Sequence, residues 1–164
     1  MITRDDNYWM GIALREAKKA ADRGEVPIGA VLVRDDAVLG RGFNFRETRH
    51  DPTAHAEIIA IRTAARKEAG WRLTNATLYV TLEPCLMCMG AMLLARIDRV
   101  VFGCHDSKGG AAGSLYDLSD DSRLNHRVVV TSGVREAECS AILSDFFAEL
   151  RREKKKVKGL ANAG

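Results

Sequence analysis

The 164-residue chain has no apolar run long enough to span a membrane, and its first residues, Met1 to Asp6, lack the apolar stretch of a secretory signal peptide. It also has no internal repeat and no stretch with the composition of a linker. Hydrophobic residues make up 46% of the chain, which is enough to build the core of one ordinary domain. These absences argue against a secreted or membrane protein, and we expect a cytoplasmic one.

Cysteine is scarce, with four residues that could form at most two disulfides. Cys85 and Cys88 have the C-x-x-C spacing of metal ligands, and a chain without an export signal keeps such thiols reduced. We expect Cys104 and Cys139 to be spare thiols that are buried or inert.

Positive charge is concentrated near the C-terminus. Residues 151–158 contain six basic residues and one acidic residue, a net charge of +5, whereas the whole chain carries +3 and the remainder therefore −2. A solvated helix end explains this pattern, and so does an arm that binds phosphates, because clustered lysine and arginine release the counterions of a polyanion.

Hydrophobic periodicity predicts a single α/β sandwich around one mixed sheet. Asp35-Asp36 indicates a hairpin turn, Thr53 a helix N-cap and Gly70 a helix end, while the glycine-rich segment 104–125 is typical of a functional loop. The predicted helices cover residues 7–23, 54–69, 85–95 and 136 to about 156, and the predicted strands residues 29–34, 37–42, 77–82, 99–103 and 127–131.

Two short motifs carry metal chemistry: His55-Ala56-Glu57 and Pro84-Cys85-Leu86-Met87-Cys88. One imidazole and two thiolates suit zinc and leave its fourth tetrahedral position for water. Both motifs fall at predicted helix starts, so we expect two helix N-termini to point at a common zinc. Glu57 is not needed as a ligand and is free to move protons.

Other assignments of these motifs remain open. A structural zinc site would need a fourth protein ligand, and a redox C-x-x-C would leave the H-x-E motif unexplained. The candidates for a fourth ligand are Cys104, Cys139, His50, His105 and His126.

The pairing of H-x-E with P-C-x-x-C resembles the zinc nucleobase deaminases. Over nearly the whole chain, the sequence resembles the bacterial tRNA-specific adenosine deaminases, through residues 29–31, 51–57, 81–91, 110–114, 125–126 and 143–147. This resemblance implies a three-layer α/β/α cytidine-deaminase-like fold with one mixed five-stranded sheet and helices on both faces. It also implies hydrolysis of the wobble adenosine of a tRNA anticodon stem-loop to inosine, by a homodimer with one Zn²⁺ per subunit. Residues 1–150 would form the deaminase domain, and residues 151–164 a basic helix end and tail.

The resemblance also assigns site residues: His55, Cys85 and Cys88 to zinc and Glu57 to proton transfer. It places Asn44 on the target nucleoside and an apolar wall against the base, although Asn44 could simply cap a turn and the wall could be ordinary core. Phe146 is equally consistent with a core stripe formed with Ile142 and Leu150. The remaining substrate contacts that the resemblance implies are Val26, Pro27, Ile28, Ala56, Pro84, Asp106, Ser107, Lys108, Phe146, Phe147, Arg151 and Arg152.

Two positions depart from the family pattern. Relatives mostly carry proline or alanine where Ser107 stands, and often proline where Ser122 stands, and both changes free the backbone in a substrate-contacting region. They weaken the expectation of strict preference for RNA. The alternatives are therefore a deaminase of free bases or nucleotides, an engineered relative that acts on adenine in single-stranded DNA, and a non-catalytic, zinc-stabilised RNA-binding module.

Overall fold

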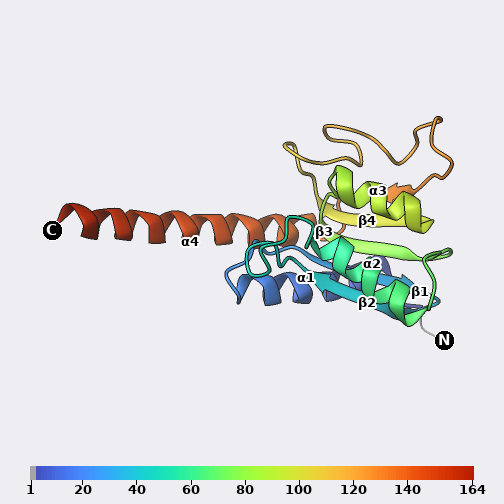
Figure 1. The fold of residues 1–164 in the computed structure, drawn as a ribbon, viewed down its shortest axis with the longest axis horizontal. Coiled ribbons are helices and arrows are strands. Elements are labelled where there is room, and N and C mark those ends of the chain that lie inside the picture. Colours follow the sequence, from blue (N-terminus) through green and yellow to red (C-terminus); the bar gives the residue numbers. More distant parts are fainter. Residues whose placement is uncertain (1–2) are drawn as a thin grey trace.

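The computed structural model describes residues 3–164, so Met1 and Ile2 of the N-terminal segment lie outside it. The elements follow the predicted order (Figure 1). They are α1 (Asp6–Ala21), β1 (Gly29–Arg34), β2 (Ala37–Phe43), α2 (Ala56–Lys67), β3 (Thr77–Leu82), α3 (Leu86–Ala95), β4 (Arg99–Cys104), β5 (Val129–Thr131) and α4 (Glu136–Asn162).

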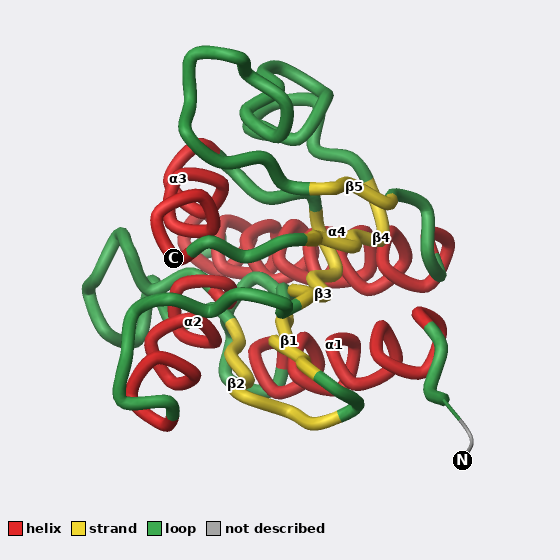
Figure 2. Tube along the Cα trace, turned by 90° about the vertical axis from the view of Figure 1, so that its right-hand side faces the viewer, coloured by secondary structure: helices red, strands yellow, loops and turns green. Residues whose placement is uncertain are grey.

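The five strands form one mixed sheet in the order β2-β1-β3-β4-β5. β1 is antiparallel to both β2 and β3, whereas β3, β4 and β5 are parallel. Helices α2 and α3 cover one face, and α1 and α4 the other (Figure 2). The predicted three-layer architecture is confirmed.

Glycines let the helices lie directly against the hairpin of β1 and β2. A Cβ on Gly29 would meet the Ala13 carbonyl oxygen of α1 at 2.0 Å, and one on Gly42 would meet the Ala56 carbonyl oxygen of α2 at 2.2 Å. Such distances exclude any side chain, so backbone packs on backbone. Ala56 is the first residue of α2, so the close contact at Gly42 holds the start of this helix against β2.

Local turn chemistry confirms the predicted hairpin but departs from the prediction where α2 ends. The hairpin turn is confirmed, with Asp35 and Asp36 both at positive φ, as a type I′ turn requires. After α2, however, Ala69 and not Gly70 adopts the left-handed conformation, at φ 50°. Gly70 N donates to Ala65 O and Ala69 N to Arg66 O, which completes a Schellman motif without glycine at its left-handed position.

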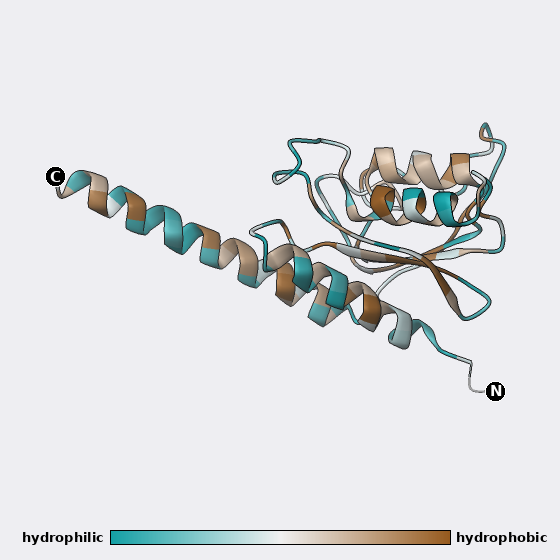
Figure 3. Cartoon of the chain, turned by 60° about the horizontal axis from the view of Figure 1, so that its bottom comes forward, coloured by the Kyte–Doolittle hydropathy of each residue, from teal (hydrophilic) through white to brown (hydrophobic). Residues whose placement is uncertain are grey.

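Helix α4 is longer than predicted, because it continues to Asn162 and does not end near residue 156. It crosses residue 150 without a break, and every residue from 151 onward is exposed. This part projects beyond the body of the molecule and carries both hydrophilic and hydrophobic residues (Figures 1 and 3). The predicted last strand is shorter, since only Val129–Thr131 pair with β4.

Within residues 3–164, no helix combines the length and the apolar character needed to cross a membrane.

The glycine contacts generate a stability prediction. Gly42→Ala should lower the free energy of unfolding by about 3 kcal/mol, because the new methyl group would push α2 away from β2. Gly70→Ala is the control, since its Cβ would meet only the Glu68 carbonyl oxygen at 3.8 Å and its φ is not positive. Urea unfolding measures both variants, and a Gly42→Ala protein as stable as Gly70→Ala would contradict the assigned packing.

Candidate active site

The site forms at one edge of the sheet, where several segments meet. Because β1 is antiparallel to β2 and β3, the latter two strands run in the same direction and end at the same edge. Helix α2 follows β2 and α3 follows β3, so both helices begin there. The chain also enters β1 and leaves β4 at this edge, since β4 is parallel to β3. The strand directions therefore bring these segments together around one point.

His55 and Cys85 occupy the N-cap positions of α2 and α3. Both have extended backbones, and neither side chain caps its own helix, so both are free to point away from the helix ends. The prediction that Thr53 caps α2 is wrong. The Thr53 hydroxyl and N–H both donate to Asp51 Oδ1, at 2.7 and 2.8 Å, and this local turn delays the start of the helix to Ala56.

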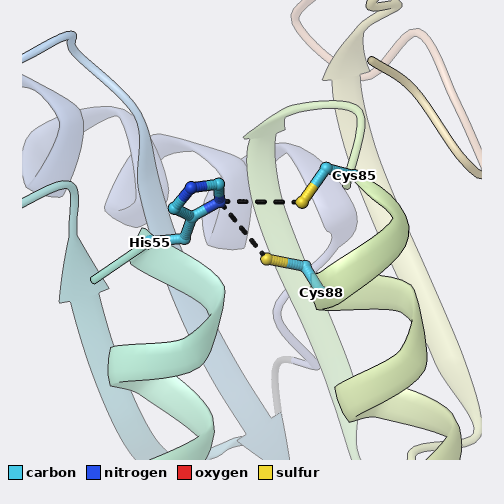
Figure 4. Close-up of side chains that lie close together, drawn as sticks. All are labelled: His55, Cys85 and Cys88. Atoms are coloured by element: carbon cyan, nitrogen blue, oxygen red, sulfur yellow. Dashed lines mark hydrogen bonds between the residues drawn. The ribbon is translucent and has the colours of Figure 1, made fainter. Parts of the chain in front are cut away.

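The imidazole and the two thiols converge as predicted (Figure 4). His55 Nδ1 lies 3.7 Å from Cys85 Sγ and 3.6 Å from Cys88 Sγ, and the three donor atoms lie within 4.8 Å of one another. In a tetrahedral zinc site, bond lengths of about 2.3 Å to sulfur and about 2.05 Å to nitrogen separate those two ligand atoms by about 3.6 Å. The donor set therefore fits zinc in both chemistry and spacing.

The two thiols differ in how readily they lose a proton. A hydrogen bond from Cys88, together with one involving His55, lowers the pKa of Cys85 to about 4, while the thiolate of Cys85 and burial raise the pKa of Cys88. One anionic sulfur is thus held at neutral pH next to a nitrogen ligand. A cation of borderline softness would favour the second thiolate as well.

The alternative fourth ligands lie elsewhere among the described residues, where the metal-ligand group contains only His55, Cys85 and Cys88. Cys104 Sγ contacts the Thr81 carbonyl oxygen at 3.5 Å, and His126 Nε2 lies 2.7 Å from the Ile97 carbonyl oxygen. His105 contacts Glu83, His50 is exposed, and Cys139 is buried. The described residues therefore do not support a structural zinc site with four protein ligands. Cys104 and Cys139 are both buried, as expected.

Glu57 lies in the first turn of α2 and is 4% exposed. Its carboxylate is not among the grouped ligand atoms, which fits the prediction that it is not a ligand. Burial raises the pKa of Glu57 to about 7. A carboxyl group with that pKa exchanges protons readily at neutral pH, as general acid–base catalysis requires.

A cavity of about 240 Å³ opens beside these groups. Pockets that bind drug-sized ligands have volumes of roughly 300–1,000 Å³, so this cavity is small and has room for a single flat ring. Nine of the predicted site residues line it: Val26, Ile28, Asn44, His55, Ala56, Glu57, Cys85, Asp106 and Phe147.

Asn44 caps a turn and also lines the cavity. Its Oδ1 accepts from Arg46 N at 3.2 Å, which caps the turn after β2, and its Nδ2 donates to the Val26 carbonyl oxygen at 3.3 Å. The side chain is 5% exposed and also forms part of the cavity wall.

The other predicted residues lie outside the cavity lining. Pro27, Pro84 and Cys88 are buried, and Phe146 is half-buried with its ring 5.5 Å from that of Phe147. A second hollow shares Phe147 with the first and brings together Lys108, Leu143, Ser144 and Arg151. The remaining predicted residues, Ser107 and Arg152, are exposed, as is Ser122.

Three cavity residues were not predicted: Arg46, Leu82 and Glu83. Leu82 ends β3 and Glu83 follows it directly before Pro84, so their position at the end of this strand was a usable signal. Arg46 lies in an irregular loop, and no periodicity or motif marks it.

The fold and the site define a nucleobase deaminase of the cytidine-deaminase-like class, and residues 4–151 match the MafB19-like deaminase family. The chain is 52% identical to the tRNA-specific adenosine deaminase of Bacillus subtilis (strain 168), over 94% of this chain and 95% of that protein. It is 54% identical to the enzyme of that name from Haemophilus influenzae, over 94% and 90%.

A solved structure from work on A-to-I editing by tRNA:A34 deaminases at the wobble position of transfer RNA is 47% identical, with a TM-score of 0.79 over 82% of this chain and 98% of that one. The chain belongs to the family of tRNA-specific adenosine deaminases.

The environment of Glu57 predicts a pH effect on protein stripped of metal by chelation. The folded state holds the Glu57 proton up to about pH 7, whereas the free carboxyl ionises near 4.5. The stability from this buried neutral acid is therefore present below pH 4.5 and is lost as the pH rises to 7. In urea unfolding, Glu57→Gln should gain stability relative to the unsubstituted protein at pH 8 compared with pH 5. An equal difference at both pH values would argue against this environment.

Proposed function

We propose that this protein is a zinc-dependent enzyme that hydrolyses adenosine to inosine at the wobble position of a tRNA anticodon. The observation that carries the proposal is the group of His55, Cys85 and Cys88 beside a base-sized cavity that also contains the buried acid Glu57. The family membership supports the same substrate, as do the names of the similar enzymes from Bacillus subtilis and Haemophilus influenzae.

His55, Cys85 and Cys88 are the residues that would hold one zinc ion per chain. When bound, zinc supplies Lewis-acid activation of a water molecule. Glu57 takes one proton from the water that attacks C6 of adenine and delivers it to the ring nitrogen. It then takes the proton of the new C6 hydroxyl group and delivers it to the departing ammonia.

The cavity accepts the adenine base after it has left the stack of the anticodon loop. Val26 and Ile28 provide apolar contacts for the ring faces, with Pro27 buried behind them. Asn44 provides polar atoms for the nucleoside. Ala56, the neighbour of His55, lines the cavity, and Pro84 lies buried beside Cys85 just outside the lining, so the base lies near the two helix starts.

Flanking nucleotides lie over the second hollow. Lys108 and Arg151 supply positive charge for phosphates there, and Phe147, which is 40% exposed, offers a ring face for stacking. Asp106, Ser107, Phe146 and Arg152 complete this set of proposed contacts.

We assign residues 1–150 to the deaminase domain and residues 151–164 to a basic arm that extends along the RNA. Because the substrate is tRNA, the proposed place of action is the cytoplasm. We also assign a homodimer, with α3 as its contact surface. This helix has no charged residue, and Leu94 is 73% exposed and Leu86 47% exposed on its outer side.

Substrate preference separates this proposal from deamination of free bases or nucleotides. We predict that an anticodon stem-loop with adenosine at the wobble position is deaminated far faster than adenosine, adenine or cytidine, because a free nucleoside makes no contact with the second hollow. Inosine release measured by chromatography tests this. Equal rates on the free nucleoside would favour the small-molecule alternative, and no deamination by zinc-loaded protein would favour the non-catalytic RNA-binding module.

The same assay with the matching deoxy stem-loop tests discrimination by the ribose hydroxyl. Ser107 and Ser122 are exposed in the loop between β4 and β5. Retained activity on the deoxy substrate would support the alternative of a relative that acts on adenine in single-stranded DNA.

The basic arm generates a separate prediction. Replacing Arg151, Arg152, Lys154 and Lys155 by glutamine should weaken stem-loop binding and flatten the slope of log Kd against log salt by roughly 0.7 to 0.9 per lost phosphate contact. The rate at saturating RNA should stay near its original value, because these side chains are outside the cavity. Unchanged affinity and an unchanged slope would mean that the arm is only a solvated helix end.

A further inference from the structure

Two walls of the cavity are irregular loops. Residues 44–55 connect β2 to α2 and contribute Asn44 and Arg46, and residues 105–114 follow β4 and contribute Asp106. Backbone N–H groups in such loops have no strand or helix partner and need other acceptors. In this protein, a buried carboxylate supplies acceptors to each loop.

Glu83 is the acceptor for the loop 105–114. Its side chain is completely buried directly after β3. Oε1 accepts from Asp106 N at 3.2 Å and from the Ser114 hydroxyl, and Oε2 accepts from Ala112 N and Ser114 N, each at 3.1 Å. Both ends of the loop are therefore tied to one carboxylate.

The loop is shaped to approach this carboxylate closely. A Cβ on Gly110 would lie 2.2 Å from Glu83 Oε2, so only glycine fits at that position. Ala111 N also donates to the Pro84 carbonyl oxygen at 2.8 Å, which aligns the loop with the segment that leads into Cys85. The loop 105–114 thus contacts both the Glu83 carboxylate and the backbone of Pro84.

Glu25 has the same arrangement on the opposite wall. It is fully buried after the left-handed Gly24, which turns the chain at the end of α1. Its Oε1 accepts from Thr48 N at 2.6 Å and its Oε2 from Glu47 N at 3.2 Å. These donors directly follow Arg46, so the carboxylate fixes the turn that carries Asn44 and Arg46 into the cavity.

We propose that Glu25 and Glu83 are positioning residues, which hold the two loop walls where Asn44, Arg46 and Asp106 meet the substrate. This role deepens the proposed function and rests on it. Neither residue is assigned a catalytic role. Glu83 accepts hydrogen bonds from Asp106, Ala112 and Ser114, and Glu25 accepts them from Glu47 and Thr48, so both carboxylates serve as acceptors for loop donors.

Glu25→Gln and Glu83→Gln test the proposal, because each keeps the side-chain shape and replaces one acceptor oxygen with a donor. Amide hydrogen exchange on the metal-loaded protein should accelerate about tenfold within 45–50 for Glu25→Gln and within 106–114 for Glu83→Gln. Each variant is the control for the loop that it does not touch. Asp120→Asn, on an exposed side chain of the loop between β4 and β5, should leave both regions unchanged.

Kinetics on the anticodon stem-loop separate positioning from chemistry. Both glutamine variants should raise KM about tenfold and keep kcat within about threefold, because the walls move while Glu57 does not. Zinc content should stay at the level of the unsubstituted protein. Ser114→Ala removes one donor to Glu83 and should produce a smaller change of the same kind, even if Glu83→Gln does not fold.

Unchanged exchange in the matching loop would overturn the proposal, and so would loss of kcat at full zinc content with unchanged KM. Loss of zinc from Glu83→Gln would overturn the proposal for Glu83, because it would mean that this residue supports the metal ligand Cys85 and not the loop 105–114. The exchange measurement does not depend on turnover. Failure of the unsubstituted enzyme to deaminate the stem-loop would therefore contradict the proposed function separately from the anchoring contacts.

Discussion

The site depends on the direction of the strands that precede its two helices. β2 and β3 run the same way with β1 between them, so α2 and α3 begin at one edge of the sheet. His55 and Cys85 stand at the N-caps, where a side chain extends past the helix end, and the next turns add Glu57 and Cys88. The glycine contact at Gly42 keeps α2 close enough to the sheet for this arrangement to form. A helix that began one residue earlier would turn His55 away from the thiols.

Two buried acids in the same cavity have opposite environments, and this difference separates their roles. Burial raises the pKa of Glu57 to about 7. Burial also opposes the ionised form of Glu83, but hydrogen bonds from Ser114, Asp106 and Ala112 hold the pKa of that carboxyl below its usual range. Acids separated in this way divide proton transfer from structural support.

Most of the fold and the set of metal ligands could be predicted from the sequence. Strand alternation and helix periodicity predicted all nine elements, and the paired motifs predicted that His55, Cys85 and Cys88 meet. Helix ends were less predictable, because tertiary contacts and turns between side chain and backbone decide them. Asp51 accepts a hydrogen bond from the Thr53 hydroxyl, so His55 becomes the N-cap of α2. At the other end of this helix, Ala69 adopts the left-handed conformation that glycine adopts most easily. Arg46 lies in an irregular loop that no local pattern marks. The contacts of Glu83 with the loop 105–114 span more than 20 residues, so only its place beside Pro84 was visible in the sequence.

The proposed mechanism requires that three side chains hold zinc while Glu57 moves protons without binding the metal. Zinc content and deamination of the anticodon stem-loop, measured together in Glu57→Gln, test this division of roles. We expect about one zinc per chain and a rate reduced by a factor of roughly 10² or more, because glutamine keeps the shape of the side chain and cannot accept the proton. Loss of zinc along with activity would make Glu57 a ligand, and full activity would contradict its assigned role altogether.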